Sequence, residues 1–175
     1  MKQIIFVVET NASNQSDDRY IKKLIINRYN LINNDVKLQF IHMNGKCNYS
    51  NKSVLTQINK LIKYNINNDN FVIYCFDTDK INTNFVDLKK FNEEKLYCNN
   101  KNFKFIWFNC DIEYVLLNKS VESGKKKKES IKFFNNEKSV IPIKNLFCSN
   151  EQLKGYSNFY LILDEILNKY KKCNK

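Results

Sequence analysis

Short apolar runs alternate along the chain with longer stretches in which apolar side chains recur at helical spacing. The short runs are rich in β-branched and aromatic residues, which is typical of strands buried on both faces of a parallel sheet. They predict strands at residues 3–9, 36–43, 70–76 and 103–108. The longer stretches predict helices at residues 17–30, 51–65, 83–97, 111–119, 125–134 and 156–170. This alternation predicts βαβ units, and so an α/β, Rossmann-like fold with a mainly parallel four-stranded sheet and helices on both faces.

Some side chains of this pattern predict local detail. In the helix at 83–97, a set of apolar side chains is expected to face the core. They are Phe85, Leu88, Phe91 and Leu96. Asn109 is expected to cap the helix that starts at Asp111. The stretch at 140–143, Val-Ile-Pro-Ile, predicts an extended piece at the edge of the sheet.

The length of the chain predicts one domain. A chain of 175 residues is long enough for a single well-filled core, so we expect one domain over residues 1–175. The regular alternation makes residues 3–119 its core. Residues 120–175 predict a basic, mostly helical C-terminal extension.

Carboxylates follow two of the predicted strands. Glu9 comes directly after the first strand, and Asp77 and Asp79 come directly after the third. In open α/β sheets, ligands bind just beyond the carboxyl ends of the strands. Carboxylate oxygens are the ligands that Mg²⁺ prefers in proteins. The sequence therefore predicts a site for Mg²⁺ or Mn²⁺ at this edge of the sheet.

The charge of the chain favours a polyanionic partner. The formal net charge is +11, and residues 119–175 carry 13 lysines against 6 acids, which gives +7. A basic surface beside an acidic metal site would let a nucleic-acid backbone approach the carboxylates. The densest lysine run is Lys125, Lys126, Lys127 and Lys128. A solvated lysine face is an equally good interpretation of this run.

Several other chemistries are not indicated. The six cysteines form no Cys-x-x-Cys pair, and the glycines Gly45, Gly124 and Gly155 form no phosphate-binding loop. His42 is the only histidine and is expected to be structural. The apolar run at the N-terminus is too short for a signal peptide, and no stretch is long enough to span a membrane. We therefore expect a soluble, reduced, cytoplasmic protein with no membrane partner.

The order of these acids resembles the Toprim domain, the metal-dependent fold of topoisomerases, primases and several nucleases. Glu9 and the segment DDRYIKKL at 17–24 resemble the opening of RloB-like proteins and other Toprim nucleases of phage-defence loci. The segment FNCDIEYVLL at 108–117 is similar to the segment that follows the fourth strand in the RloB-like group. Thr10 replaces the usual glycine, and Cys110 replaces a proline. The resemblance covers roughly residues 3–119.

The resemblance implies roles for the acids after the strands. Asp77 and Asp79 would hold Mg²⁺ or Mn²⁺, and Glu9 would be a metal ligand or the general acid/base. Crowding of carboxylates raises their pKa values when no metal is bound, as proton transfer near neutral pH requires. Alternatively, such acids are simply helix caps, and Asp79 could cap the next helix in this way.

Further residues have weaker implied roles. Asp17 or Asp18, together with Glu113, would complete a second metal position, and Lys80 would contact a substrate phosphate. The alternative for Asp17 and Asp18 is a favourable charge at a helix start, and Glu113 also suits a first helical turn. Lys80 is equally consistent with a solvated surface lysine.

The function predicted from these features is a metal-dependent nuclease that cleaves phosphodiester bonds in DNA or RNA, in the context of anti-phage defence. The short chain predicts that substrate selection needs a partner subunit or self-association. A coupled ATPase as that partner is implied only by the resemblance. One alternative is a non-catalytic Toprim-fold module that binds nucleic acid or a protein partner. Another is a different enzyme with an Asp-x-Asp motif, such as a sugar-nucleotide transferase or a phosphatase. Phosphatases of the haloacid dehalogenase type carry this motif after the first strand, where this chain has Glu9.

Overall fold

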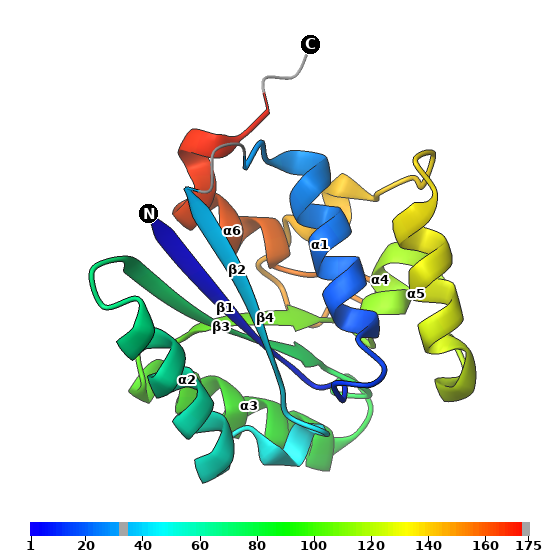
Figure 1. The fold of residues 1–175 in the computed structure, drawn as a ribbon. Coiled ribbons are helices and arrows are strands. Elements are labelled where there is room, and N and C mark those ends of the chain that lie inside the picture. The colour runs from blue at the N-terminus through cyan, green and yellow to red at the C-terminus, as the bar shows by residue number, and fades with distance from the viewer. Residues whose placement is uncertain (32–34, 173–175) are drawn as a thin grey trace.

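The sheet has four parallel strands and lies at the centre of the molecule (Figure 1). The computed structural model describes residues 1–31 and 35–172. The strands are β1 (Lys2–Val8), β2 (Val36–His42), β3 (Asp69–Asp77) and β4 (Lys104–Phe108), in the order β2-β1-β3-β4. All three pairs of neighbouring strands are parallel. The predicted α/β class, with a four-stranded parallel sheet, is confirmed.

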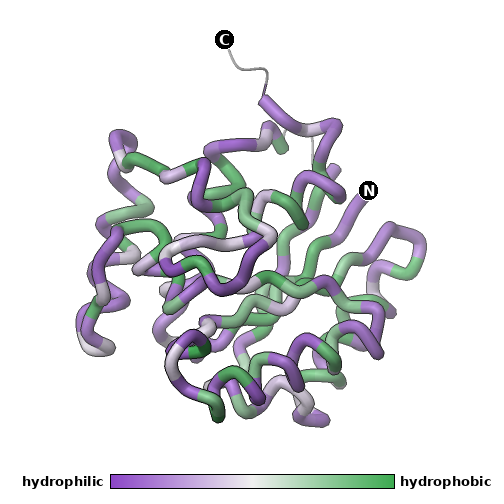
Figure 2. Tube along the Cα trace, turned by 180° about the vertical axis from the view of Figure 1, so that it is seen from behind, coloured by the Kyte–Doolittle hydropathy of each residue, from purple (hydrophilic) through white to green (hydrophobic). Residues whose placement is uncertain are grey.

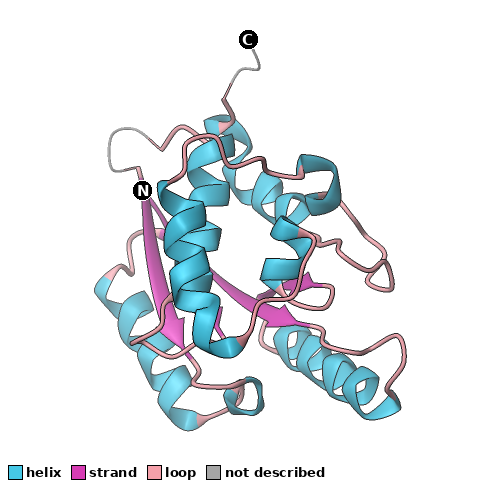
Figure 3. Cartoon of the chain, turned by 90° about the vertical axis from the view of Figure 1, so that its right-hand side faces the viewer, coloured by secondary structure: helices cyan, strands magenta, loops and turns pink. Residues whose placement is uncertain are grey.

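Helices cover both faces of the sheet, because the strands are apolar on both sides (Figure 3). One face is covered by α1 (Ser16–Arg28), α4 (Ile112–Leu117), α5 (Lys126–Asn135) and α6 (Phe159–Leu167). The other face is covered by α2 (Lys52–Tyr64) and α3 (Phe85–Asn100). Short 3-10 helices lie at Lys46–Asn48, Ser123–Lys125, Ile143–Leu146 and Asn168–Tyr170.

The alternation of side chains along each strand divides the core in two. In β1, Ile4 and Phe6 pack against α1 and α6, whereas Ile5 and Val7 pack against α2 and α3. Figure 2 shows hydrophobic colour along the central strands and much hydrophilic colour in the outer loops. Over the described residues, none of the helices is long and apolar enough to cross a membrane.

Residues after the fourth strand close the outer edge of β4. Ser157 forms an antiparallel bridge with Phe108, and its hydroxyl donates a hydrogen bond to the Trp107 carbonyl at 2.6 Å. The Asn158 side chain completes the edge, because it accepts from the Trp107 N–H and donates to the Phe105 carbonyl. The C-terminal extension therefore belongs to the same packed unit as the sheet. Cys173 and the end of the basic tail lie outside the described residues.

The structure corrects several details predicted for helices. Phe85 and Leu96 are exposed, and Glu94 and Cys98 instead face the core beside Phe91. Asp111 caps α4 by accepting from the Tyr114 N–H at 2.7 Å, so Asn109 is not the cap.

Two predicted elements of the C-terminal extension also differ. The stretch at 140–143 pairs with no described strand and leads into a 3-10 helix. The last helix begins at Phe159 rather than at Tyr156, because the residues before it pair with β4. Phe159 and Tyr160 at the start of this helix are buried, so their aromatic rings pack in the core.

Candidate functional site

The strand order reverses between β1 and β3, and two of the predicted acids lie at this point. From β1 the chain passes to β2 on one side, and from β3 it passes to β4 on the other. Such a switch point opens a crevice at the carboxyl ends of the two strands. Glu9 and Asp77 lie side by side there, and the Asp77 N–H donates a hydrogen bond to Glu9 Oε1 at 2.9 Å.

A pocket of about 370 Å³ opens at this point. Three acids contribute to its wall: Glu9 after β1, Asp77 at the end of β3, and Asp17 in the first turn of α1. The remaining lining residues are polar or small, apart from one lysine. They are Thr10, Asn11, Asn14, Asn44, Gly45, Ser123 and Lys126. The structure therefore brings together three acids that are separated by up to 68 positions in the sequence.

Burial and mutual repulsion raise the pKa values of these acids. Burial raises the pKa of Glu9 to about 8, against the opposing effects of Lys46 and the Asp77 N–H. The pKa of Asp77 is raised well above its usual range by burial and by the charges of Glu9 and Asp17. Burial also raises the pKa of Asp17, against the opposing charge of Lys126. Such strongly perturbed carboxylates in an open pocket are typical of functional sites.

Lys126, from the lysine run, forms one side of the site. Its ammonium donates to Glu113 Oε2 at 3.0 Å and to Asp111 Oδ2 at 3.5 Å. Burial opposes its charge, but Asp77 and Glu113 raise its pKa above the usual value. Glu113 is fully buried, and burial raises its pKa to about 7. No described residue donates a hydrogen bond to Glu113 Oε1, so Lys126 only partly compensates this carboxylate.

Lys46 forms the opposite side, and the sequence analysis did not identify it. Its ammonium donates to the Asp77 carbonyl at 2.5 Å, and it lies 3.4 Å from Asp79 Oδ2 and 3.9 Å from Glu94 Oε2. Burial opposes the charge of Lys46, but Glu94 and Glu9 raise its pKa. The available signals were the Asn44-Gly45 turn, which brings Lys46 back toward the strand ends, and the helical spacing of Glu94 from Phe91.

Asp79 is placed differently from Asp77. Its side chain is 58% exposed and does not line the pocket. Its backbone has φ = 54°, and its N–H donates to the Cys110 carbonyl at 3.0 Å. This hydrogen bond ties the loop after β3 to the loop after β4 and turns the Asp79 carboxylate toward Lys46. Asp79 does not cap α3, because Asn84 does so.

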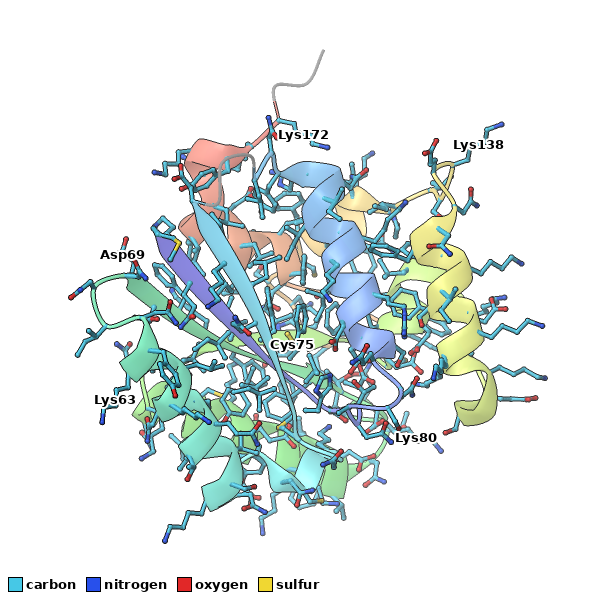
Figure 4. The ribbon with its side chains drawn as sticks, in the orientation of Figure 1. Lys63, Asp69, Cys75, Lys80, Lys138 and Lys172 are labelled. Carbon is cyan, nitrogen blue, oxygen red and sulfur yellow. The ribbon has the colours of Figure 1, made fainter. Side chains whose placement is uncertain are left out.

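The remaining predicted residues lie outside the pocket. Asp18 is buried and pairs with His42, with Asp18 Oδ1 3.0 Å from His42 Nε2. Lys80 is exposed on the loop after β3, at the end of the strand opposite Asp69 (Figure 4).

The other lysines of the run do not line the pocket. Lys125 pairs with Glu122 at 2.7 Å, and Lys127 donates to the Ser13 carbonyl at 3.1 Å. Lys128 is exposed on α5. Of the four, Lys126 alone reaches the acids.

The donors of the pocket fit a hard divalent cation by their chemistry. Within the described part of the chain, no three side chains of the metal-binding types already form a coordination group. Mg²⁺ usually takes only one or two carboxylates from a protein and keeps several waters, so it does not need such a group. Asp77 and Asp17 would supply the charge. Thr10 Oγ1 and Asn14 Oδ1 are buried oxygens of two lining residues, and no described group donates a hydrogen bond to either.

Comparison of the chain with models of protein families, with curated proteins and with solved structures found no match. The Toprim resemblance therefore rests on the sequence segments given above and stays a prediction.

Proposed function

We propose that the protein is a metal-dependent nuclease that cleaves phosphodiester bonds at the pocket formed by Glu9, Asp17 and Asp77. The single observation that supports this most is the crowding of these acids at the switch point of the sheet, with raised pKa values. A fold that needed these acids only for stability would neutralise them with donors. Here, the open pocket leaves room for Mg²⁺ or Mn²⁺ and for a substrate.

When bound, Mg²⁺ or Mn²⁺ would supply neutralisation of the phosphate oxygens and polarisation of the phosphorus. Water would attack the phosphorus in line while the bond to the leaving oxygen breaks, and the attacking water would release its proton to solvent. The chain itself would provide the proton. With a pKa of about 8, Glu9 carries a proton at neutral pH. Its Oε1 accepts the Asp77 N–H, so Oε2 is the oxygen that would hold this proton and pass it to the leaving oxygen.

Lys126 would hold the substrate phosphate beside the acids. Its ammonium lies on the pocket wall and is only partly exposed, so it offers a positive charge in a site with little competing water. Exposed Lys125 and Lys128 on either side would attract the nucleic-acid backbone at longer range. A role in anti-phage defence depends on the resemblance alone and is proposed together with the activity.

The decisive experiment is cleavage of plasmid, single-stranded DNA and total tRNA with Mg²⁺, with Mn²⁺ and with EDTA. We expect metal-dependent cutting by the wild type and a loss of about 10²-fold or more in both Glu9→Gln and Asp77→Asn. Asp69→Asn is the matched control, because it removes an exposed acid at the opposite end of β3 (Figure 4). Cutting that persists in EDTA, or equally in all variants, would contradict the proposal.

A second candidate is a non-catalytic module that binds nucleic acid without metal. The positions of two lysines favour this candidate. Lys126 lies 3.0 Å from Glu113 and Lys46 lies 3.4 Å from Asp79, so both place positive charge beside the acids without a metal. In that case fluorescence anisotropy would show binding that survives EDTA and Asp77→Asn, with no cleavage. Lys126→Ala would then weaken binding and reduce its dependence on salt.

A further inference from the structure

Helix α3 carries a stripe of side chains that faces away from the core. Its two ends are large apolar residues, Phe85 at 78% exposure and Leu96 at 59%. Together with Leu88, which is half-buried and also packs against the core, they line a groove of about 320 Å³. Lys89, Asn92 and Glu93 complete the lining. We call these six residues the α3 stripe.

The exposure of the α3 stripe follows from the way the helix packs. Phe91, Glu94 and Cys98 are buried against the sheet and lie on one side of the helix. At 100° per residue, Phe85, Lys89, Asn92 and Leu96 lie on the opposite side. A contiguous apolar groove with a polar rim usually marks an interaction surface rather than a solvated face.

The charge of α3 argues against a nucleic acid as the occupant. The helix carries three lysines and three acids, a net charge of zero, whereas the whole chain carries +11. A surface that binds a phosphate backbone would be expected to share the basic character of the chain. The neutral α3 stripe instead suits a protein surface of similar composition.

We infer that the α3 stripe binds a second copy of this chain, with the two α3 helices antiparallel. A two-fold axis that passes between Lys90 and Phe91 places Phe85 of each copy opposite Leu96 of the other. These two residues are about 16 Å apart along the helix, or three turns, so both ends of the contact are apolar. The same axis places Lys89 of each copy opposite Asn92 of the other and one residue, about 1.5 Å along the helix, from Glu93. This is close enough for two equivalent opposite-charge contacts.

The symmetry also fixes how the two pockets are arranged. Helix α3 begins near the carboxyl ends of the strands, where the pocket lies, and ends near their amino ends (Figure 1). Antiparallel pairing therefore places the two pockets at opposite ends of the dimer, where each acts independently. A single helix face is a small interface, so we expect dissociation in the micromolar range rather than a permanent dimer.

Sedimentation equilibrium of the full chain over a range of concentrations tests this contact, at about 0.15 M salt to screen the net charge. We expect a monomer–dimer equilibrium in the wild type and only monomer in Phe85→Lys and in Leu96→Lys. Val140→Lys is the matched control, because it adds the same charge at an apolar position that is 84% exposed and remote from α3. It should dimerise like the wild type.

Charge reversal tests the proposed register. Lys89→Glu should weaken the dimer about fivefold, since it places two acids opposite each other at both equivalent contacts. Glu93→Lys should weaken it similarly, and the double variant Lys89→Glu/Glu93→Lys should restore it. Three results would overturn the inference: a wild type that stays monomeric up to about 1 mM chain, a dimer that survives Phe85→Lys, or a double variant without restored dimerisation.

Discussion

The two ends of helix α1 hold carboxylates in opposite ways. At the C-terminal end, Asp164 of α6 accepts two hydrogen bonds from Arg28, at 2.9 and 2.6 Å, and one from the Tyr29 hydroxyl at 2.6 Å. Lys171 adds an ion pair at 2.9 Å. At the N-terminal end, Asp17 lies in the pocket beside Glu9 and Asp77, where few donors are available.

The difference in donors reverses the direction of the pKa shifts. Burial alone would raise the pKa of Asp164, but its hydrogen bonds from Arg28, Tyr29 and Lys171 lower it to about 2. Burial raises the pKa of Glu9 to about 8, because Lys46 and one N–H compensate it only in part. Glu9 is deeply buried with few donors, whereas Asp164 is less deeply buried with several charged donors, so burial and donors together separate the two acids.

This contrast separates a structural site from a candidate functional one. The Asp164 cluster fixes α6 against α1, with Arg28 also lying over the rings of Phe147 and Tyr160. The pocket holds acids whose charges are unfavourable in the free protein, which is the condition that a bound cation would relieve.

Breaking the Asp164 cluster should have the largest effect on stability. We expect Asp164→Ala to reduce the free energy of unfolding by about 2–3 kcal/mol near pH 7, measured by urea denaturation. The pKa of Asp164 is lowered in the folded state, so this contribution is present above its usual pKa and disappears as the pH falls toward about 2. Glu165→Ala is the control, because its ion pair with Lys104 is exposed and should contribute less than about 1 kcal/mol.

Neutralising Glu9 should increase the free energy of unfolding, whereas removing Asp164 decreases it. Its pKa rises from 4.5 to about 8 on folding, so the folded chain keeps a proton that the unfolded chain releases, and stability falls as the pH rises between these values. We expect Glu9→Gln to match the wild type below about pH 4.5 and to be more stable by about 1–2 kcal/mol near pH 8. The glutamine can still accept the Asp77 N–H. A variant that is less stable near pH 8 would show that the Glu9 charge is already compensated.

Removing Lys126 should have a smaller effect on stability. We expect Lys126→Met to reduce the free energy of unfolding by about 1 kcal/mol near pH 8. The cause is the buried Glu113 carboxylate, which would lose its ammonium partner. The double variant Lys126→Met/Glu113→Gln should recover most of the loss, since the Glu113 charge that Lys126 compensates is then removed as well. Lys128→Met, at an exposed position on the same helix, is the control. Additive losses in the double variant would mean that the two side chains act separately.

Much of the fold could be predicted because the strands carry a strong local signal. The run at 71–76 is apolar or aromatic throughout, so it is a buried strand wherever it lies in the sheet. The exposed face of α3 could not be predicted in this way. There a buried Glu94 and Cys98 define the inner face, whereas Phe85 and Leu96, which look like core residues, lie outside. Hydrophobicity alone cannot identify a face whose buried members are polar or small.

Part of the candidate site could likewise be predicted from the sequence, and part could not. The proximity of Glu9 to Asp77 follows from the general rule that ligands lie at strand ends, so it could be expected before the structure was seen. The contact of Lys126 with Glu113 could not, because it depends on the packing of α5 beside α1 and α4. Lys46 was missed for a similar reason, since only the turn after β2 brings it to the Asp77 carbonyl.

The smallest expected effect distinguishes the two acids of the Asp-x-Asp motif. Asp79→Asn should change the free energy of unfolding by less than about 0.5 kcal/mol, because the side chain is exposed and asparagine tolerates the left-handed backbone at φ = 54°. Mn²⁺ should raise the melting temperature of this variant as much as that of the wild type, whereas Asp77→Asn should abolish the increase. If Asp79→Asn also abolishes it, both acids hold the metal, as the Toprim resemblance implies. Asp79 would then have to turn from Lys46 into the pocket when metal binds.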